Sequence, residues 1–479
     1  MLDLNRRQFL QGTPAALAGA PFVQTAREGG GAPNVLLILC DQMRGDALST
    51  LGSPNARTPN LDRLASRGVL SERCFANNPV CVPSRKSIFS GQYPHQHGSL
   101  SNPHGHHLPW AGSMAQHFEK KGYRTGYVGK NHTFVKEAVG KFAYSSIRDR
   151  EPFRAYNRHV APNWHMDSMW PEEKCYASVN TDAAVEFLSS AKSSEPFFLT
   201  VSYFDPHPPY MAPARFTSRY ASRDMKLPEP IPPSEISRRL GEHAAAMQFD
   251  KQTDADLTET LRYYYAAIEY GVDHQVGRLV KTLEDRKLEN TLIVFTSDHG
   301  DFMSHYRMVR KGMLLYDHLL HVPLIVSHPR LASGGRRMRN MAQLVDLFPT
   351  MMELTGDKLS GHLAGQSLLP LLRGERRSAQ EAVFASAGYG KVDVPKIEAA
   401  AKTSERPLHT RVFDVVMEAD HKTATLRTPE WRFTLSEADP PELFHLNGSV
   451  GERKNLAETV EHASVRRDLE KRLTSYWKW

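Results

Sequence analysis

The sequence predicts an α/β protein with one large, mostly parallel β-sheet and helices on both of its faces. Short, continuously apolar runs such as Asn34–Cys40 and Thr291–Thr296 predict strands that are buried on both sides. Helical patterns separate these runs, and an alternation of strand and helix is typical of parallel sheets. The length of 479 residues indicates one large domain plus a smaller one.

The remaining elements of the large domain follow in order along the chain. A helix is expected after Thr58, because threonine can cap a helix and Pro59 suits its first turn. Apolar residues recur every three or four positions from Leu261 to Leu283, which predicts one long amphipathic helix. Further strands are expected at Arg124–Val128, Pro196–Phe204 and Val322–Val326.

The pattern weakens after about residue 376. Strand candidates remain at Val412–Val416 and Arg432–Leu435, and a helix is expected from Ala463 to Trp479. We therefore expect a large domain over residues 33–375 and a small C-terminal subdomain over residues 376–479.

The N-terminal segment is expected to be an export signal. The run Asn5-Arg6-Arg7-Gln8-Phe9-Leu10 resembles a twin-arginine motif, and a short apolar stretch with a small-residue cleavage site at Ala18-Gly19-Ala20 follows it. Residues 1–32 would then be a signal peptide and linker, and the protein would be bacterial, folded before export, and periplasmic or secreted. The alternative is a disordered basic tail. No segment is long and apolar enough to predict a membrane span.

The net charge and the number of cysteines argue against two classes of protein, those that bind nucleic acid and those held together by disulfides. The net charge of +7 suits an anionic substrate, but it is diffuse and no RNA-binding motif accompanies it, so no nucleic-acid partner is expected. Four cysteines are too few for a disulfide framework in a chain of this length.

Polar side chains follow two of the predicted strands directly. Asp41 and Gln42 come after the first strand, and Asp298 and His299 come after a later one. Open α/β sheets bind ligands at the carboxyl ends of their strands. Two carboxylates, an amide oxygen and an imidazole can hold one divalent cation. Either pair alone could instead cap a helix or bind backbone, but both pairs together favour a metal site.

A cysteine motif, Cys81-Val82-Pro83-Ser84-Arg85, lies between these two pairs in the sequence. Taken alone it predicts the start of a helix, with proline in the first turn. Together with Lys86-Ser87-Ile88-Phe89-Ser90-Gly91 it resembles the signature of type I sulfatases, in which the cysteine of C-x-P-S-R is oxidised to formylglycine after translation.

Other motifs in the same order extend this resemblance over most of the chain. They are Asp41-Gln42, Gly129-Lys130-Asn131-His132, the loop around His207, Thr296-Ser297-Asp298-His299-Gly300-Asp301, Val309-Arg310-Lys311-Gly312 and Glu442-Leu443-Phe444-His445-Leu446. The sequence thus resembles the formylglycine-dependent type I sulfatases of the alkaline phosphatase superfamily. That resemblance implies a large α/β domain and a small C-terminal subdomain in which a helix packs on an antiparallel sheet.

The resemblance also implies a metal site. Its ligands would be Asp41, Gln42, Asp298 and His299, with the modified Cys81 as a further ligand. Many relatives have aspartate in place of Gln42 and asparagine in place of His299, whereas some sulfatases and phosphonate monoester hydrolases carry the glutamine and histidine. The family favours Ca²⁺, but only two carboxylates are present here, so Mg²⁺ and Mn²⁺ stay open.

The same resemblance implies the catalytic roles. One hydroxyl of the hydrated formylglycine would attack sulfur, and the second would expel sulfate. A general acid would protonate the leaving oxygen, with His207 as first choice and Lys311 as second, while His132 would take the proton of the second hydroxyl. Basic side chains around the sulfuryl group would stabilise developing charge. The catalytic set expected is Cys81, Arg85, Lys130, His132, His207 and Lys311.

The function expected from these features is hydrolysis of a sulfuric ester, with a sulfated carbohydrate as substrate. A formylglycine-generating or sulfatase-maturating enzyme would be a partner that acts before export. A phosphonate monoester or phosphodiester hydrolase would use the same site, and Gln42 and His299 keep that alternative open. A catalytically silent protein that binds sulfated glycans is the alternative from another class, if Cys81 stays a thiol.

Overall fold

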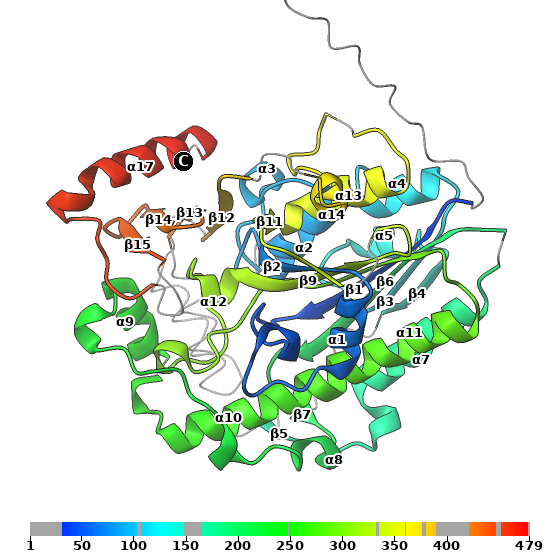
Figure 1. Ribbon diagram of the computed structural model, residues 1–479, viewed down its shortest axis with the longest axis horizontal. Helices are drawn as coiled ribbons and strands as arrows, with labels where there is room; N and C mark the ends of the chain where they lie inside the picture. The colour runs from blue at the N-terminus through cyan, green and yellow to red at the C-terminus, as the bar shows by residue number, and fades with distance from the viewer. Residues whose placement is uncertain are drawn as a thin grey trace, which may run out of the picture. The chain divides into compact units, whose positions relative to one another are not determined.

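A large sheet dominates the computed structural model (Figure 1), which describes residues 31–102, 107–147, 165–192, 194–247, 249–331, 335–359, 361–375, 380–388, 421–446 and 452–477. The described strands run in the order β10-β2-β9-β8-β1-β6-β3-β4, and β11 also pairs with β2. Their bounds are β1 Asn34–Asp41, β2 Val69–Phe75, β3 Arg124–Gly129, β4 Tyr144–Ile147, β6 Phe197–Pro206, β8 Thr291–Ser297, β9 His321–Ser327, β10 Arg336–Met338 and β11 Ala342–Gln343.

The sheet is mostly parallel, which confirms the predicted fold class. Strand β1 lies at its centre and pairs in parallel with β6 and β8. Strand β9 is the exception, because it runs antiparallel to both β2 and β8.

Successive residues of β1 face two different hydrophobic cores. Val35, Leu37 and Leu39 belong to one core, whereas Leu36 and Ile38 belong to the other. This alternation follows from the pleat of a strand. It also explains why the sequence of β1 is apolar throughout, since both faces of the strand are covered by helices.

Helices cover both faces of the sheet (Figure 1). Residues of α2, α4 and α13 contribute to the first core, and residues of α1, α7, α10 and α11 contribute to the second. Their bounds are α1 Pro59–Ser66, α2 Cys81–Ser90, α4 Met114–Lys120, α7 Tyr176–Ser189, α10 Asp254–Ala267, α11 Gln275–Asp285 and α13 Leu347–Leu354. The shorter elements are α3 Pro94–His97, α5 Lys136–Val139, β5 His165–Asp167, β7 Tyr210–Ala212, α8 Ala214–Thr217, α9 Arg238–Ala246, α12 Asp317–Leu320 and α14 Leu369–Leu372.

The long amphipathic helix predicted from Leu261 to Leu283 contains a π-helical segment. Helices α10 and α11 are joined by π-helical residues, Ile268–His274. The wider turn places Gly271 against the side chain of Asp205, because a Cβ atom on Gly271 would lie 2.3 Å from the Asp205 Cγ atom. Such π-helical insertions are frequent at functional sites.

A separate antiparallel sheet lies near the C-terminus, as expected. Its strands are β12 Val383–Ala387, β13 Thr423–Arg427, β14 Trp431–Ser436 and β15 Glu442–His445, in that order. Helix α17, Ala463–Tyr476, packs on it through Leu469 and Leu473. The predicted strand at Val412–Val416 lies outside the described residues, and the subdomain boundary at residue 376 stays a prediction.

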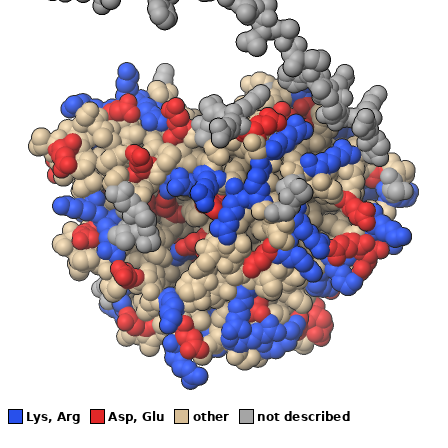
Figure 2. Space-filling model, in the orientation of Figure 1, with Lys and Arg blue, Asp and Glu red and all other residues tan. Residues whose placement is uncertain are grey.

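Three further features concern the chain as a whole. None of the helices described is long and apolar enough to cross a membrane. All four cysteines, Cys40, Cys74, Cys81 and Cys175, are buried free thiols. Basic and acidic side chains are interspersed over the face shown in Figure 2, so the positive net charge is not gathered into one basic stripe there.

Candidate active site

The two polar pairs predicted at strand ends lie next to each other. Strands β1 and β8 are parallel neighbours with Cys40 opposite Ser297, so the residues that follow them meet at one edge of the sheet. Gln42 adopts a left-handed backbone conformation with φ 71°, and its N–H donates to Asp298 Oδ1 at 3.1 Å. This turn directs both carboxylates toward the same point.

Cys81 is the first residue of α2, and its side chain is buried beside the two strand ends. Its Sγ atom lies 2.9 Å from Lys311 Nζ, 3.3 Å from His299 Nε2 and 3.6 Å from Asp41 Oδ1. The predicted helix start is therefore confirmed, and the same motif delivers the cysteine side chain to the strand ends. We call Asp41, Gln42, Cys81, Asp298 and His299, together with Lys130 and Lys311, the reaction centre.

The charges around Cys81 favour its ionised form. Burial and the nearby Asp41 carboxylate would raise the pKa of the thiol. The positive charges of Lys130 and Lys311, together with His299, outweigh them and lower this pKa to about 5. These surroundings favour the thiolate of Cys81, whereas burial raises the pKa of the Cys40 thiol above its ordinary value.

The donor atoms of the reaction centre fit a divalent cation. One ligand atom from each of Asp41, Cys81, Asp298 and His299 lies within 4.8 Å of every other. The Nδ1 atom of His299 is 2.9 Å from the Gly300 carbonyl oxygen. A carbonyl oxygen accepts only, so this contact places a proton on Nδ1, and with a cation bound the lone pair of Nε2 would face it, as in metal-binding histidines.

Gln42 completes this donor set in a defined orientation. Its Nε2 amide donates to Asp301 Oδ2 at 2.6 Å, and the same oxygen accepts a hydrogen bond from the Tyr210 hydroxyl at 2.7 Å. A carboxylate only accepts hydrogen bonds, so the amide nitrogen must face Asp301. The Gln42 Oε1 atom is buried without a hydrogen-bond partner. A buried oxygen of this kind is costly unless a cation or a donor satisfies it.

Arg85 lies completely buried behind the two carboxylates. Its Nε donates to Asp298 Oδ2 at 2.7 Å, one terminal nitrogen donates to Asp41 Oδ2 at 3.1 Å, and the other donates to Ser202 Oγ at 2.7 Å. The guanidinium therefore holds both carboxylates in place and balances their charge.

Both predicted lysines lie beside Cys81. Lys130 Nζ donates to Asp41 Oδ2 at 2.6 Å, is 3.8 Å from Cys81 Sγ and lies 4.4 Å from the centre of the Phe204 ring. Lys311 Nζ contacts Cys81 Sγ and is also 3.0 Å from His299 Nε2. Both amines can therefore reach a group bonded to residue 81.

The two predicted histidines are half-buried beside these lysines. Burial, with Lys130 next for His132 and Lys311 next for His207, holds the pKa of each imidazole well below its usual range. His207 Nδ1 is 2.7 Å from the Pro208 carbonyl oxygen, whereas His132 Nδ1 is buried without a hydrogen-bond partner. Both imidazoles are therefore neutral near pH 7 and able to accept a proton.

Sequence reasoning assigned no role to several residues that support the site. Ser202 binds Arg85, Asp301 and Tyr210 orient Gln42, and Phe204 lies under Lys130. Asp301 was within a matched motif, so a signal for it was present. Ser202, like Thr200, is a polar residue in the mostly apolar first part of β6, which is a weaker signal.

Comparison with known proteins gives matches over most of the chain. A family model described as sulfatase matches residues 33–357. The choline-sulfatase of Rhizobium meliloti is 28% identical over 466 residues, which cover 89% of this chain and 83% of that protein. The N-acetylglucosamine-6-O-sulfatase of Bacteroides thetaiotaomicron is 24% identical over 509 residues, or 93% and 88% of the two chains.

Solved structures share the fold as well. The phosphonate monoester hydrolase of Agrobacterium radiobacter superimposes with a TM-score of 0.74 at 22% sequence identity. The match covers 92% of this chain and 95% of that one.

Proposed function

Because this chain belongs to the sulfatase family, we propose that its reaction centre hydrolyses a sulfuric ester with a formylglycine made from Cys81 and a bound divalent cation. The observation that carries the proposal is the position of Cys81. It lies at the start of a helix, among four potential metal ligands and within reach of two lysines.

Formylglycine would supply what no encoded side chain offers. Its hydrate has one hydroxyl for attack on sulfur and a second whose deprotonation expels the sulfate. The carboxylates Asp41 and Asp298, the Gln42 Oε1 atom and His299 Nε2 would hold the cation, which supplies Lewis-acid polarisation of the sulfuryl oxygens.

The basic residues of this chain divide into two groups by geometry. The three nitrogens of Arg85 donate to Asp298, Ser202 and Asp41, so we propose that it positions the metal ligands. Lys130 and Lys311 have amines beside Cys81 Sγ, so they can donate directly to sulfuryl oxygens. Donors aimed at developing charge contribute about 2.7–4 kcal/mol each to transition-state stabilisation.

Two proton transfers remain, and histidines are suited to both. His132 is a neutral base for the second hydroxyl of the hydrate. His207 is our first candidate to protonate the leaving oxygen, since an anionic substrate beside it would raise its lowered pKa. Lys311 is the second candidate. Replacing His207 or Lys311 separates the two candidates, because loss of the general acid slows substrates with poor leaving groups the most.

The substrate class is proposed from the family resemblance and the predicted export. We propose a sulfated carbohydrate, and relatives of this chain include a protein named as an N-acetylglucosamine-6-O-sulfatase. The twin-arginine motif at residues 5–10 supports a periplasmic or secreted location. Detection of the mature protein outside the cytoplasm, cleaved after about residue 20, would test that location.

A substrate panel tests the reaction. The protein is produced with a formylglycine-generating enzyme, conversion of Cys81 is checked by peptide mass, and an aryl sulfate, a phosphodiester and a phosphonate monoester are compared under identical conditions. We expect the aryl sulfate to be turned over with the highest kcat/KM. A converted enzyme that acts only on phosphorus esters would contradict the proposal.

That outcome would instead support the second candidate, a phosphonate monoester or phosphodiester hydrolase. The observation that keeps it open is the presence of Gln42 and His299. The family resemblance places this pair in phosphonate monoester hydrolases and in some sulfatases, where many other sulfatases have aspartate and asparagine.

A further inference from the structure

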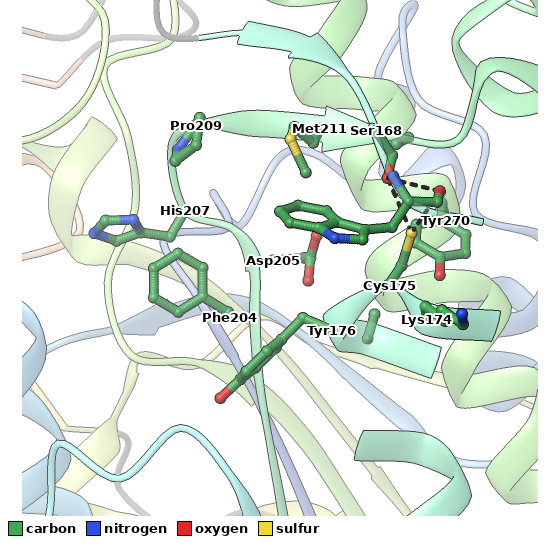
Figure 3. Close-up of a pocket in the computed structure, with 13 residues that line it drawn as sticks. Ser168, Lys174, Cys175, Tyr176, Phe204, Asp205, His207, Pro209, Met211 and Tyr270 are labelled. Atoms are coloured by element: carbon green, nitrogen blue, oxygen red, sulfur yellow. Dashed lines mark hydrogen bonds between the residues drawn. The ribbon is translucent and has the colours of Figure 1, made fainter. Parts of the chain in front are cut away.

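A cavity with aromatic walls adjoins the reaction centre (Figure 3). It has a volume of about 70 Å³ and is mostly apolar. Trp170, Tyr176, Phe204 and Tyr270 line it, and the carboxylate of Asp205 lies among them. We call these five residues the aromatic subsite.

The aromatic subsite and the reaction centre share a wall. Phe204 lines the cavity, and Lys130 Nζ lies 4.4 Å from the centre of the same ring. His207 also lines the cavity, and its ring centre is 4.7 Å from that of Phe204. A group attached through oxygen to a sulfate at Cys81 can therefore extend past His207 into this cavity.

Asp205 is an unusual group to find in such a cavity. None of the described side chains donates a hydrogen bond to its carboxylate, and burial raises its pKa to about 7. The carboxylate fits there because Gly271, in the π-helical segment, leaves room for it. The same segment carries Tyr270, whose hydroxyl is fixed by Ser178 at 2.9 Å and by the Glu172 carbonyl oxygen at 3.0 Å.

Aromatic faces around a carboxylate that accepts no hydrogen bond from a described side chain attract one class of ligand. Ring faces carry negative potential and bind alkylated ammonium groups, which also have an apolar surface. We propose that the aromatic subsite binds an alkylammonium group on the alcohol part of the sulfate ester. This inference rests on the proposed sulfatase function and names the feature that the leaving group would carry.

A hydroxyl-rich sugar ring fits the cavity less well, so a carbohydrate substrate would place an alkylammonium substituent in the cavity and its ring outside it. Each buried hydroxyl needs a hydrogen-bond partner, and most of the described lining is hydrocarbon. Among the lining residues, Lys174 would oppose a cation, but it is exposed, and Figure 3 shows its side chain at the far end of the cavity from His207.

The test compares two esters that differ only in charge. Choline sulfate and its neutral isostere, neohexyl sulfate, are offered to the converted enzyme, and kcat/KM is measured for each. We expect choline sulfate to be preferred by about 30-fold. Both are also measured as competitive inhibitors of aryl sulfate turnover, so an ester that is not hydrolysed still reports its relative affinity. Equal values for the two esters overturn the proposal.

Two variants and one control test whether the preference for choline sulfate arises in the aromatic subsite. Asp205→Asn keeps the shape and removes the charge, and Trp170→Leu removes one aromatic wall; each should lower the preference for the cation toward unity. Glu173→Gln removes an exposed carboxylate just outside the cavity and should leave the preference unchanged. A preference that survives in both Asp205→Asn and Trp170→Leu also overturns the proposal.

Failure of this inference and failure of the proposed function give different results. If the converted enzyme hydrolyses the aryl sulfate but does not distinguish the two isosteres, the subsite proposal alone is wrong. If no sulfate ester is hydrolysed, the proposed function is wrong.

Discussion

The reaction centre and the aromatic subsite share a wall but are built on opposite principles. In the reaction centre both carboxylates are held by several donors, and the Arg85 behind them donates to Asp41, Asp298 and Ser202. In the aromatic subsite the polar group that stands among the rings, Asp205, accepts no hydrogen bond from a described side chain.

This difference assigns the chemical step to the reaction centre and the choice of substrate to the aromatic subsite. Fixed charges in a buried site are ready for the transition state and cost no reorganisation during the reaction. An apolar cavity with one buried charge and no counter-charge contributes little until a complementary group enters, and it then discriminates strongly between ligands. Replacing residues of the reaction centre should therefore change kcat or metal binding, whereas replacing residues of the aromatic subsite should change which ester is preferred.

The largest effect is expected for Cys81→Ala, which removes the precursor of the nucleophile. Aryl sulfate turnover should fall by more than about 10³-fold, as for loss of other enzymic nucleophiles. Cys74→Ala is the matched control, because Cys74 is buried in the core and is no part of the reaction centre. Near-normal turnover by Cys81→Ala would exclude a role for residue 81 in catalysis.

The next effect concerns the charge beside Cys81. Lys311→Ala removes an amine 2.9 Å from Sγ, and kcat should fall by about 10²–10³-fold because a donor to the transition state is lost. Lys281→Ala removes an exposed lysine that pairs with Asp285 and should leave steady-state kinetics unchanged. A rise in KM with constant kcat for Lys311→Ala would show that the lysine only binds substrate.

Asp301→Asn should weaken metal binding without touching a metal ligand. An asparagine can donate to Gln42 Oε1, so the Gln42 amide is expected to turn and present its nitrogen to the cation. Affinity for Ca²⁺, Mg²⁺ or Mn²⁺, measured by titration calorimetry, should fall by about 10–100-fold.

Tyr210→Phe provides the graded comparison for that result. It removes one hydrogen bond to Asp301 and leaves the carboxylate that orients Gln42, so its effect on metal affinity should be smaller. Unchanged metal affinity in Asp301→Asn would show that Gln42 does not bind the cation.

The smallest effect is a pH dependence confined to the aromatic subsite. Burial raises the pKa of Asp205 to about 7, so protonation below that pH removes its negative charge. The ratio of kcat/KM for choline sulfate to that for neohexyl sulfate should rise up to about tenfold between about pH 6 and about pH 8. His207 stays neutral in this range, since its pKa lies well below its ordinary value.

The ratio cancels titrations of the reaction centre, because both esters carry the same sulfate. Asp205→Asn should give a flat profile. A rising profile in that variant would mean that another group causes the pH dependence.

Several parts of this arrangement were predictable because their signals are local. The apolar run that ends at Asp41 predicts a buried strand, and parallel strands place their carboxyl ends together, so the pattern places Asp41 and Asp298 at the same edge of the sheet. The structure adds that their strands are neighbours. The motif at Cys81 predicts a helix start, and α2 begins at that residue.

Other parts were not predictable, because they depend on contacts between distant segments. The sequence shows that Arg85 is charged but not that its three nitrogens donate to Asp298, Ser202 and Asp41. The sequence also predicts one regular helix from Leu261 to Leu283. The π-helical residues Ile268–His274 keep the apolar side chains on the buried side, so the apolar spacing does not reveal the wider turn.

The sequence by itself determined the fold class, the strand ends that carry polar residues and the cysteine motif, because hydrophobic periodicity and short motifs are encoded within a few residues. Only the tertiary structure decided the orientation of the Gln42 amide, the position of Arg85 and the assembly of the aromatic subsite. Asp205 and Gly271 lie 66 positions apart in the chain, and they touch because a strand end and a π-helical turn pack together.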